Sequence, residues 1–255
     1  MFRTFCKKYF FRFKSLIYLK LYADKNYDYY KKKISLISKS RFDENTIRKE
    51  LDLNGYYVFD SLLNSELINI LKNEFDETIK IKSNIFDKNI TKTVQIRNYD
   101  KSFYLKNKFF LTYVLFTNPY IKKILKKVLN TKIDYNSEIF FQKTFETKYP
   151  LAGDFHFDKQ RSIKIWFYVN DCEDQNGPLE IIKGTHHDNK ILRINLGKKK
   201  FNKEKYNLLI DNVKNGIKLN AKAGSMIIFD SDVSHRASQV KFGKFREIIR
   251  GATFG

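Results

Sequence analysis

The sequence of 255 residues is poor in cysteine, proline and long apolar runs. Its two cysteines, Cys6 and Cys172, are too few for a disulfide framework and lack the paired spacing of zinc sites. They favour a reducing compartment, so we expect a cytoplasmic protein. No apolar run approaches the roughly 20 residues that a membrane-spanning helix needs. With three prolines and no low-complexity linker, the chain is expected to form one domain with a sizeable core.

Acidic residues are also scarce, because 28 Asp and Glu stand against 49 Lys and Arg, which gives a formal net charge of +21. Such an excess predicts a non-specific affinity for polyanions that weakens with salt. The lysines are nevertheless spread along the whole chain, together with many Asn, Ile, Tyr and Phe residues, all of which have A/T-rich codons. The base composition of the genome can therefore explain the charge, and we expect no specific nucleic-acid partner.

The first 45 residues differ from the rest and are predicted to be a basic, aromatic, helical extension. Aromatic and apolar residues recur on one helical face, and basic residues lie away from it. That face is made by Phe2, Phe5, Tyr9, Phe13 and Leu16. Two roles fit such a helix: peripheral contact of residues 1–22 with an anionic membrane surface, or packing of the aromatic face against the main domain. The main domain is expected to span residues 46–255.

Helix signals dominate the first part of this domain. A short helix is predicted over Thr46–Leu51 and a strand over Tyr56–Asp60. Asn64 is the predicted N-cap of a helix that runs from Ser65 to about Lys82. A further basic helix is predicted over Lys122–Leu129.

Strand signals follow after residue 137. Short β-rich segments separated by turns cover residues 138–145, 162–170, 180–183, 225–230 and 246–254. Helices followed by many short strands favour an α+β chain whose strands form a double-stranded β-helix, a jelly-roll or cupin-like barrel, flanked by N-terminal helices. The polar stretch from residue 190 to 220 is expected to be an insertion between strands that covers a site as a lid.

Two of the four histidines belong to a pattern that can bind a metal, His156-Phe157-Asp158 followed by the distant His235. On an extended strand residues i and i+2 point to the same side, so His156 and Asp158 can reach one ion. A barrel can bring His235 to the same ion from another strand. Two imidazoles and one carboxylate leave coordination positions open, which suits Fe(II) in oxygen-activating enzymes. Zinc hydrolases use similar ligands, so the three residues alone do not fix the metal.

Two arginines lie on the last predicted strand, Arg246 and Arg250, the first of them eleven residues after His235. Four residues apart, they share one face of the strand if no bulge intervenes. Either side chain can form a two-pronged salt bridge with a ligand carboxylate inside the barrel. His186-His187 is a weaker signal, for which turn histidines bonded to the backbone are favoured over a second metal pair.

Three blocks of sequence resemble a known family. "LDLNGYYVFDSLLNSELINILKNEFD" is similar to its first helix, strand and second helix, and "IKIWFYVNDCEDQNGPLEIIKGTH" to its tryptophan-bearing strand and Asn-Gly-Pro-Leu turn. "AKAGSMIIFDSDVSHRAS" is similar to the strand that leads to its last ligand histidine. The family is that of the phytanoyl-CoA dioxygenases (PhyH), which are Fe(II)/2-oxoglutarate oxygenases, and the resemblance covers roughly residues 46–254.

The resemblance implies a role for several residues. His156, Asp158 and His235 match the iron ligands, and Arg246 matches the arginine that binds the far carboxylate of 2-oxoglutarate. Trp166 matches a tryptophan of the cosubstrate pocket, and Gln142 and Lys143 lie where the family places polar contacts to 2-oxoglutarate. The chain departs from the pattern at Lys183, Ser225, Ala237 and Val240, and none of these is a metal ligand.

The expected function is therefore a dioxygenase that uses Fe(II), 2-oxoglutarate and O2. It would hydroxylate an unactivated C–H bond of a small-molecule or acyl substrate and release succinate and CO2. One alternative is an oxygenase that demethylates nucleic acid, which the net charge encourages. The other is a binding protein that has kept the barrel without the chemistry.

Overall fold

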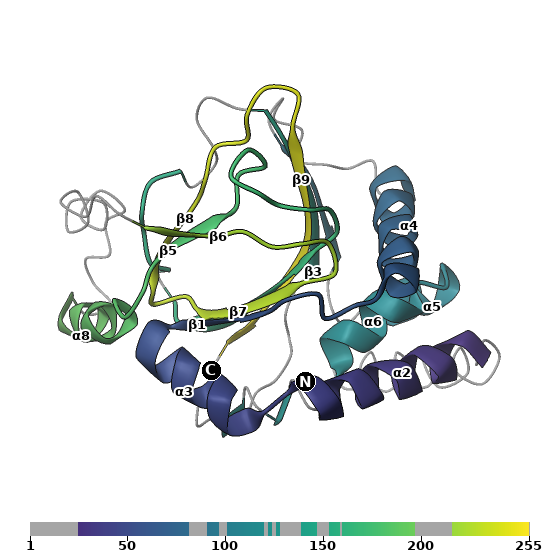
Figure 1. The fold of residues 1–255 in the computed structure, drawn as a ribbon, viewed down its shortest axis with the longest axis horizontal. Helices are drawn as coiled ribbons and strands as arrows, with labels where there is room; N and C mark the ends of the chain where they lie inside the picture. The colour runs from purple at the N-terminus through teal and green to yellow at the C-terminus, as the bar shows by residue number, and fades with distance from the viewer. Residues whose placement is uncertain are drawn as a thin grey trace, which may run out of the picture.

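The computed structural model describes residues 25–81, 91–96, 101–119, 122–123, 126–127, 139–146, 153–158, 160–196 and 216–254. Two antiparallel sheets face each other, and helices cover the outer face of the larger one (Figure 1). The helix predicted near the N-terminus and the membrane contact proposed for residues 1–22 lie outside the described residues. Within the described part, no helix is both long and apolar enough to cross a bilayer.

The larger sheet has six strands and the smaller one has three. In spatial order the first consists of β1 (Tyr56–Phe59), β7 (Met226–Asp230), β4 (Ser162–Tyr168), β9 (Phe245–Phe254), β3 (Ile139–Phe145) and β2 (Thr91–Ile96). The second consists of β6 (Ile217–Leu219), β5 (Leu179–Ile182) and β8 (Ser234–Ala237). The predicted mixture of helices and antiparallel strands is thus confirmed.

The two facing sheets fit the predicted jelly roll, but the described residues do not close them into a barrel. No ladder of hydrogen bonds joins the edge of one described sheet to the other. The strands of the small sheet are only three or four residues long. Outside the ladders the structure has isolated bridges, one of which pairs His156 with His235. The described strands therefore form two facing antiparallel sheets.

The helices are α2 (Lys25–Arg41), α3 (Glu44–Asn54), α4 (Ser65–Ile81), α5 (Lys101–Lys106), α6 (Phe110–Thr117) and α8 (His186–Leu196). Helix α3 begins two residues earlier than predicted, because Asp43 caps it by accepting a hydrogen bond from the Asn45 amide at 3.2 Å. It ends at Gly55, whose φ of 82° suits glycine. Asn64 caps α4 as predicted, since its Oδ1 accepts from the Leu67 amide at 3.1 Å.

Helix α2 lies within the predicted extension and packs on the domain. The ring of Tyr27 lies 6.1 Å from the rings of both Phe110 and Tyr113 in α6. Ile34 is buried in the main hydrophobic cluster, and Asn118 donates a hydrogen bond to Ser38 at 2.8 Å. The later part of this segment therefore contributes to the core.

Alternation along the strands separates two hydrophobic clusters. Ile163, Ile165 and Phe167 of β4 belong to the cluster under the helices, and Phe167 meets Phe116 of α6 edge to face at 5.3 Å. Trp166 belongs to the second cluster, between the sheets. Because side chains alternate, residues of β4 and β9 in phase with Trp166 point into the space between the sheets. That space holds the candidate site.

Candidate metal centre

The three predicted ligands are brought together although they come from two separate segments. Each of His156, Asp158 and His235 offers a ligand atom, and these atoms all lie within 4.8 Å of one another. His156 donates its amide to the His235 carbonyl at 3.0 Å, and His235 returns the bond at 2.8 Å. The segment around His156 is therefore an isolated bridge and not the extended strand predicted. Phe157 still points away from the site and is buried in a small cluster with Phe155.

Both imidazoles are oriented by a backbone carbonyl. Nδ1 of His156 lies 2.9 Å from the Asp154 carbonyl, and Nδ1 of His235 lies 2.8 Å from the Val233 carbonyl. Because a carbonyl only accepts, each Nδ1 carries the proton and each Nε2 keeps a lone pair for a metal. Burial, together with nearby Lys164 and His156, lowers the pKa of His235 well below its usual value. The ring of His235 is therefore neutral, which is the form that binds a metal.

The carboxylate of Asp158 has a cationic partner that the sequence analysis missed. Nζ of Lys164 lies 2.7 Å from Oδ2 of Asp158 and 3.3 Å from Nε2 of His235. Burial lowers the pKa of Lys164, and the charge of Asp158 opposes that shift. A signal for this residue existed, because Lys164 precedes Trp166 by two positions and must share its face of β4.

The predicted cosubstrate residues line the same inner face. Trp166 is paired across the sheet with Arg250, and its ring lies 5.7 Å from the guanidinium carbon of Arg246. Arg250 donates from Nε to Oε1 of Gln142 at 3.0 Å. Burial, and secondly the charge of Arg246, lower the pKa of Arg250 to about 10, so it remains a cation at neutral pH. No bulge interrupts β9 here, so the two arginines share a face as predicted.

Two buried donors in this wall fit a polar ligand. Arg246 is 2% exposed and donates from Nη1 to the Gly177 carbonyl. Within the described part of the chain, its Nε and the Nε1 of Trp166 have no hydrogen-bond partner. A buried donor without an acceptor is costly, and an anionic ligand between the sheets would supply one. The donor set therefore suits both a metal and a carboxylate-bearing cosubstrate.

Lys143 does not belong to this wall, contrary to the resemblance. It follows Gln142 on β3 and therefore points to the opposite face of the sheet. There its Nζ forms an ion pair with Oε1 of Glu247 at 2.7 Å. Of these two residues, therefore, only Gln142 is placed to make the polar contact expected on β3.

The remaining histidines are bonded to the backbone, as predicted. His186 and His187 each place Nε2 near the carbonyl of Asp52, at 3.0 and 2.7 Å. Ser225, one of the departures from the family pattern, is buried, and its hydroxyl accepts from the Ser61 amide at 3.0 Å. It supports the turn that follows β1 and lies outside the candidate site.

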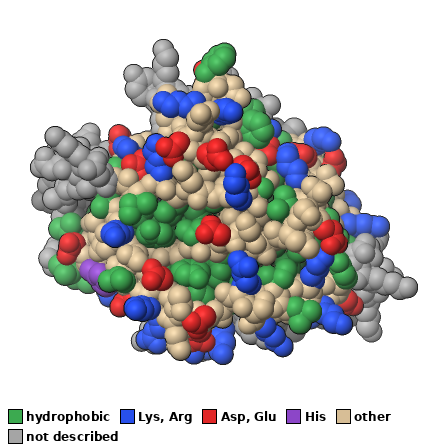
Figure 2. All heavy atoms as spheres, viewed as in Figure 1, with side chains coloured by type: hydrophobic (Ala, Val, Ile, Leu, Met, Phe, Trp, Pro, Cys, Tyr) green, Lys and Arg blue, Asp and Glu red, His purple; other side chains and the backbone are tan. Residues whose placement is uncertain are grey.

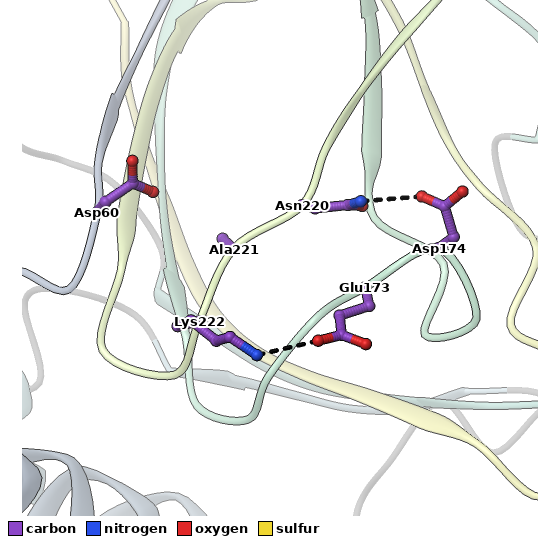
Figure 3. Close-up of a pocket in the computed structure, with 6 residues that line it drawn as sticks. All are labelled: Asp60, Glu173, Asp174, Asn220, Ala221 and Lys222. Carbon is purple, nitrogen blue, oxygen red and sulfur yellow. Dashed lines mark hydrogen bonds and ion pairs between the residues drawn. The ribbon is translucent and has the colours of Figure 1, made fainter.

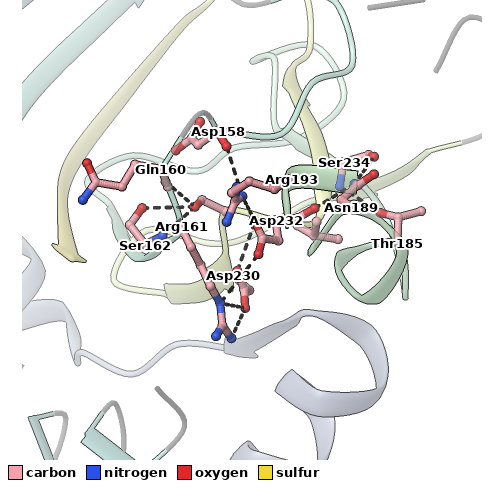
Figure 4. Close-up of polar contacts among 12 residues, drawn as sticks. Asp158, Gln160, Arg161, Ser162, Thr185, Asn189, Arg193, Asp230, Asp232 and Ser234 are labelled. Carbon is pink, nitrogen blue, oxygen red and sulfur yellow. Dashed lines mark hydrogen bonds and ion pairs between the residues drawn. The ribbon is translucent and has the colours of Figure 1, made fainter. Parts of the chain in front are cut away.

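Helix α8 is a second feature that the sequence analysis missed, since residues 190–220 were expected to be an insertion. The helix occupies 186–196, residues 197–215 lie outside the described residues, and β6 falls within the last part of the predicted insertion. Figure 4 shows Arg193 and Asn189 of α8 pointing toward the loops that carry the ligands. Their contacts could not be read from sequence, because Arg193 binds residues about 35 and 39 positions away.

A hollow elsewhere on the surface has most of its charged side chains in contacts with one another or with their neighbours. It is lined by Asp60, Glu173, Asp174, Asn220, Ala221 and Lys222 (Figure 3). Lys222 lies 2.9 Å from Glu173, and Asn220 donates to Asp174 at 2.9 Å. Among the described residues, only His156, Asp158 and His235 group closely enough to hold a metal.

Solved structures with the same fold include enzymes of nogalamycin biosynthesis and prolyl hydroxylases. The carbocyclase SnoK of nogalamycin biosynthesis is 14% identical, with a TM-score of 0.60 and coverage of 82% of this chain and 83% of that one. The epimerase SnoN, crystallised with Fe3+, α-ketoglutarate and nogalamycin RO, is 11% identical, with a TM-score of 0.58 and coverage of 83% of each chain. HygX from Streptomyces hygroscopicus, with nickel, 2-oxoglutarate and hygromycin B bound, is 10% identical, with a TM-score of 0.57 and coverage of 82% and 86%.

At these identities the structures establish the jelly-roll fold. Among curated protein sequences, none matches this chain. The sequence model of phytanoyl-CoA dioxygenase (PhyH) matches residues 51–248, which is well over half of the chain. The protein is accordingly an enzyme of the dioxygenase class that works with iron and 2-oxoglutarate, and it belongs to the phytanoyl-CoA dioxygenase family.

Proposed function

We propose that His156, Asp158 and His235 bind a single Fe(II) and that the enzyme hydroxylates an unactivated C–H bond of a small-molecule or acyl substrate. The observation that carries the proposal is the convergence of the three ligand atoms within 4.8 Å, with both Nδ1 atoms already bonded to carbonyls. When bound, iron and 2-oxoglutarate supply the oxidation, in which O2 gives one oxygen atom to the substrate and one to succinate, with loss of CO2.

The chain's own residues bind and orient the reactants. Arg246 would hold the far carboxylate of 2-oxoglutarate, because its buried Nε donor faces the space between the sheets. Trp166 forms an apolar wall beside it, and Gln142 fixes Arg250 at 3.0 Å. Water is kept out by the inner cluster that surrounds Trp166. Lys164 orients Asp158 by binding Oδ2, which leaves Oδ1 for the metal.

Hydroxylation is favoured over halogenation, because Asp158 fills the third protein ligand position that a halide would need. SnoN is an epimerase and SnoK a carbocyclase, so the fold also serves other oxidations. The non-catalytic alternative is disfavoured by the geometry, since a barrel that had lost its chemistry would not be expected to keep all three ligands in register.

The test is release of succinate by purified protein supplied with Fe(II), ascorbate and 2-oxoglutarate, where slow turnover without substrate is sufficient. His156→Ala and Asp158→Ala are each expected to abolish that release, because a two-ligand site holds iron weakly. His187→Ala is the matched control, since this exposed histidine binds only a backbone carbonyl and should leave the rate unchanged. Full activity in both ligand variants would refute the proposal.

A further inference from the structure

Helix α8 touches both loops that carry the candidate ligands. Arg193 donates from Nη2 to the main-chain carbonyl of Asp158 at 3.1 Å. The same nitrogen forms an ion pair with the carboxylate of Asp232, three residues before His235. The guanidinium also lies 5.7 Å from the ring centre of Phe157. One side chain thus joins the loop of the first two ligands to the turn that precedes the third (Figure 4).

A second residue of α8 holds the same turn. Asn189 precedes Arg193 by four positions and so lies on the same helical face. Its amide donates to the Asp232 carbonyl at 2.7 Å and to the Ser234 hydroxyl at 2.9 Å. Asn189 and Asp232 are both buried, at 6% and 0% exposed. The contacts lie away from water, where charge-assisted and neutral hydrogen bonds constrain geometry most strongly.

The two ligand loops have further direct ties, one of which is Lys164, whose Nζ contacts both Asp158 and His235. The isolated bridge between His156 and His235 and the bond from the Asp158 amide to the Ser231 carbonyl at 2.9 Å join them through the backbone. A metal needs its ligand atoms at about 2 Å, so small relative shifts of the loops weaken binding. Residues that orient metal ligands without touching the metal typically change its affinity roughly 10- to 100-fold.

We propose that Arg193 is a positioning residue, which fixes the Asp158 loop relative to the His235 turn and thereby sets the affinity of the site for its metal. The inference rests on the proposed metal site and adds a residue to it. Arg193 works by bridging two acceptors at once. A lysine can keep the ion pair with Asp232, but its flexible stem lacks the planar, preorganised guanidinium that holds one donor nitrogen between the two acceptors.

The experiment measures Mn(II) affinity by isothermal titration calorimetry in two variants of the full chain. Arg193→Lys keeps the charge, and the double variant Arg193→Met with Asp232→Asn removes both charges, so that no buried carboxylate is left without a partner. We expect Mn(II) affinity to fall roughly 10- to 100-fold in the double variant and by a smaller factor in Arg193→Lys. The visible spectrum of the Co(II)-loaded protein should change in both, while the melting temperature of metal-free Arg193→Lys should stay near that of the unmodified chain.

Arg161→Lys is the matched control. Arg161 binds Asp230 at 2.6 Å and lies 3.7 Å from Asp232, and among the described residues it has no ion pair with Asp158. Its substitution should leave Mn(II) affinity within about twofold of the unmodified chain. Unchanged affinity and spectrum in either folded Arg193 variant would overturn the inference. Failure of the unmodified chain to bind Mn(II) would instead overturn the proposed function, so the two results are distinguishable.

Discussion

Two neighbouring arginines on one strand face differ in what they already bind. Arg246 is fully buried beside Trp166, and its Nε has no acceptor within the described part of the structure. Arg250 has its Nε engaged by Gln142 and its guanidinium 4.3 Å from the ring of Phe140. A buried N–H donor without an acceptor can bind a carboxylate directly. A donor that is already hydrogen-bonded must first give up its acceptor. The contacts therefore favour Arg246 as the residue that binds 2-oxoglutarate.

Replacing each arginine separately by glutamine should show which of them binds the cosubstrate. Arg246→Gln is expected to weaken 2-oxoglutarate binding to the Mn(II)-loaded protein roughly 10- to 150-fold, because a charge-assisted hydrogen bond contributes about 1.5–3 kcal/mol. Arg250→Gln, the matched variant, should lower the affinity by less than about threefold. Calorimetric titration with 2-oxoglutarate gives both values. A larger loss in Arg250→Gln would move the role to that residue.

Single residues were predictable from sequence where a local rule applied and unpredictable where the partner is distant. Alternation placed Arg246 and Arg250 on one face, and the resemblance assigned Trp166 to the pocket. Applied to β3 and β4, alternation would also have excluded Lys143 and revealed Lys164. The bonds of Arg193 depend on where a helix packs, which no local spacing encodes.

At the scale of elements, one buried carboxylate joins two helices. Glu74 of α4 accepts hydrogen bonds from the amides of Leu111 and Thr112 at the start of α6, at 2.9 and 2.8 Å, and from the Thr112 hydroxyl at 2.6 Å. It thereby satisfies donors that the first turn of a helix leaves open. Burial nevertheless raises the pKa of Glu74 to about 7, and the three donors only partly offset that shift.

This shift predicts a pH dependence of stability. Because the folded pKa of about 7 lies above the ordinary 4.5, the folded chain binds the proton more tightly than the unfolded chain. The resulting stabilisation is complete below pH 4.5 and is lost as the pH rises through 7, with a total on the order of 3 kcal/mol. Urea unfolding should therefore show the unmodified chain losing stability relative to Glu74→Gln as the pH rises over this range, because glutamine mimics the neutral carboxyl and does not titrate. If the free energies of unfolding of the two proteins change with pH in parallel, the prediction is contradicted.

Elements were predictable where their ends carry signals. Asn64 caps the start of α4 as predicted, and Gly55, with its positive φ, ends α3. That the described sheets stay open was not predictable, because closure depends on pairing between short edge strands. His156 and His235 meet at an isolated bridge. The sequence shows which residues they are but not that their backbones pair.

Over the whole molecule, the net charge of +21 is dispersed. Figure 2 shows Lys and Arg side chains scattered over the visible face, with acidic side chains interspersed among them. Many lysines are paired locally, as in the contacts of Lys222 with Asp171 and Glu173 at 3.0 and 2.9 Å. A surface of this kind attracts polyanions weakly through its total charge.

The charge therefore predicts binding to nucleic acid without turnover. A fluorescent single-stranded oligonucleotide should bind at low salt, and its affinity should fall steeply between about 50 and 200 mM salt, because binding of this kind releases counterions. Neither a methylated oligonucleotide nor its unmethylated match should raise succinate release, since a demethylating oxygenase must place the modified base at its metal. Fluorescence anisotropy and the succinate assay measure the two effects on one preparation. Succinate release stimulated by the methylated strand alone would instead favour the nucleic-acid demethylase, with the dispersed charge as its means of holding the substrate.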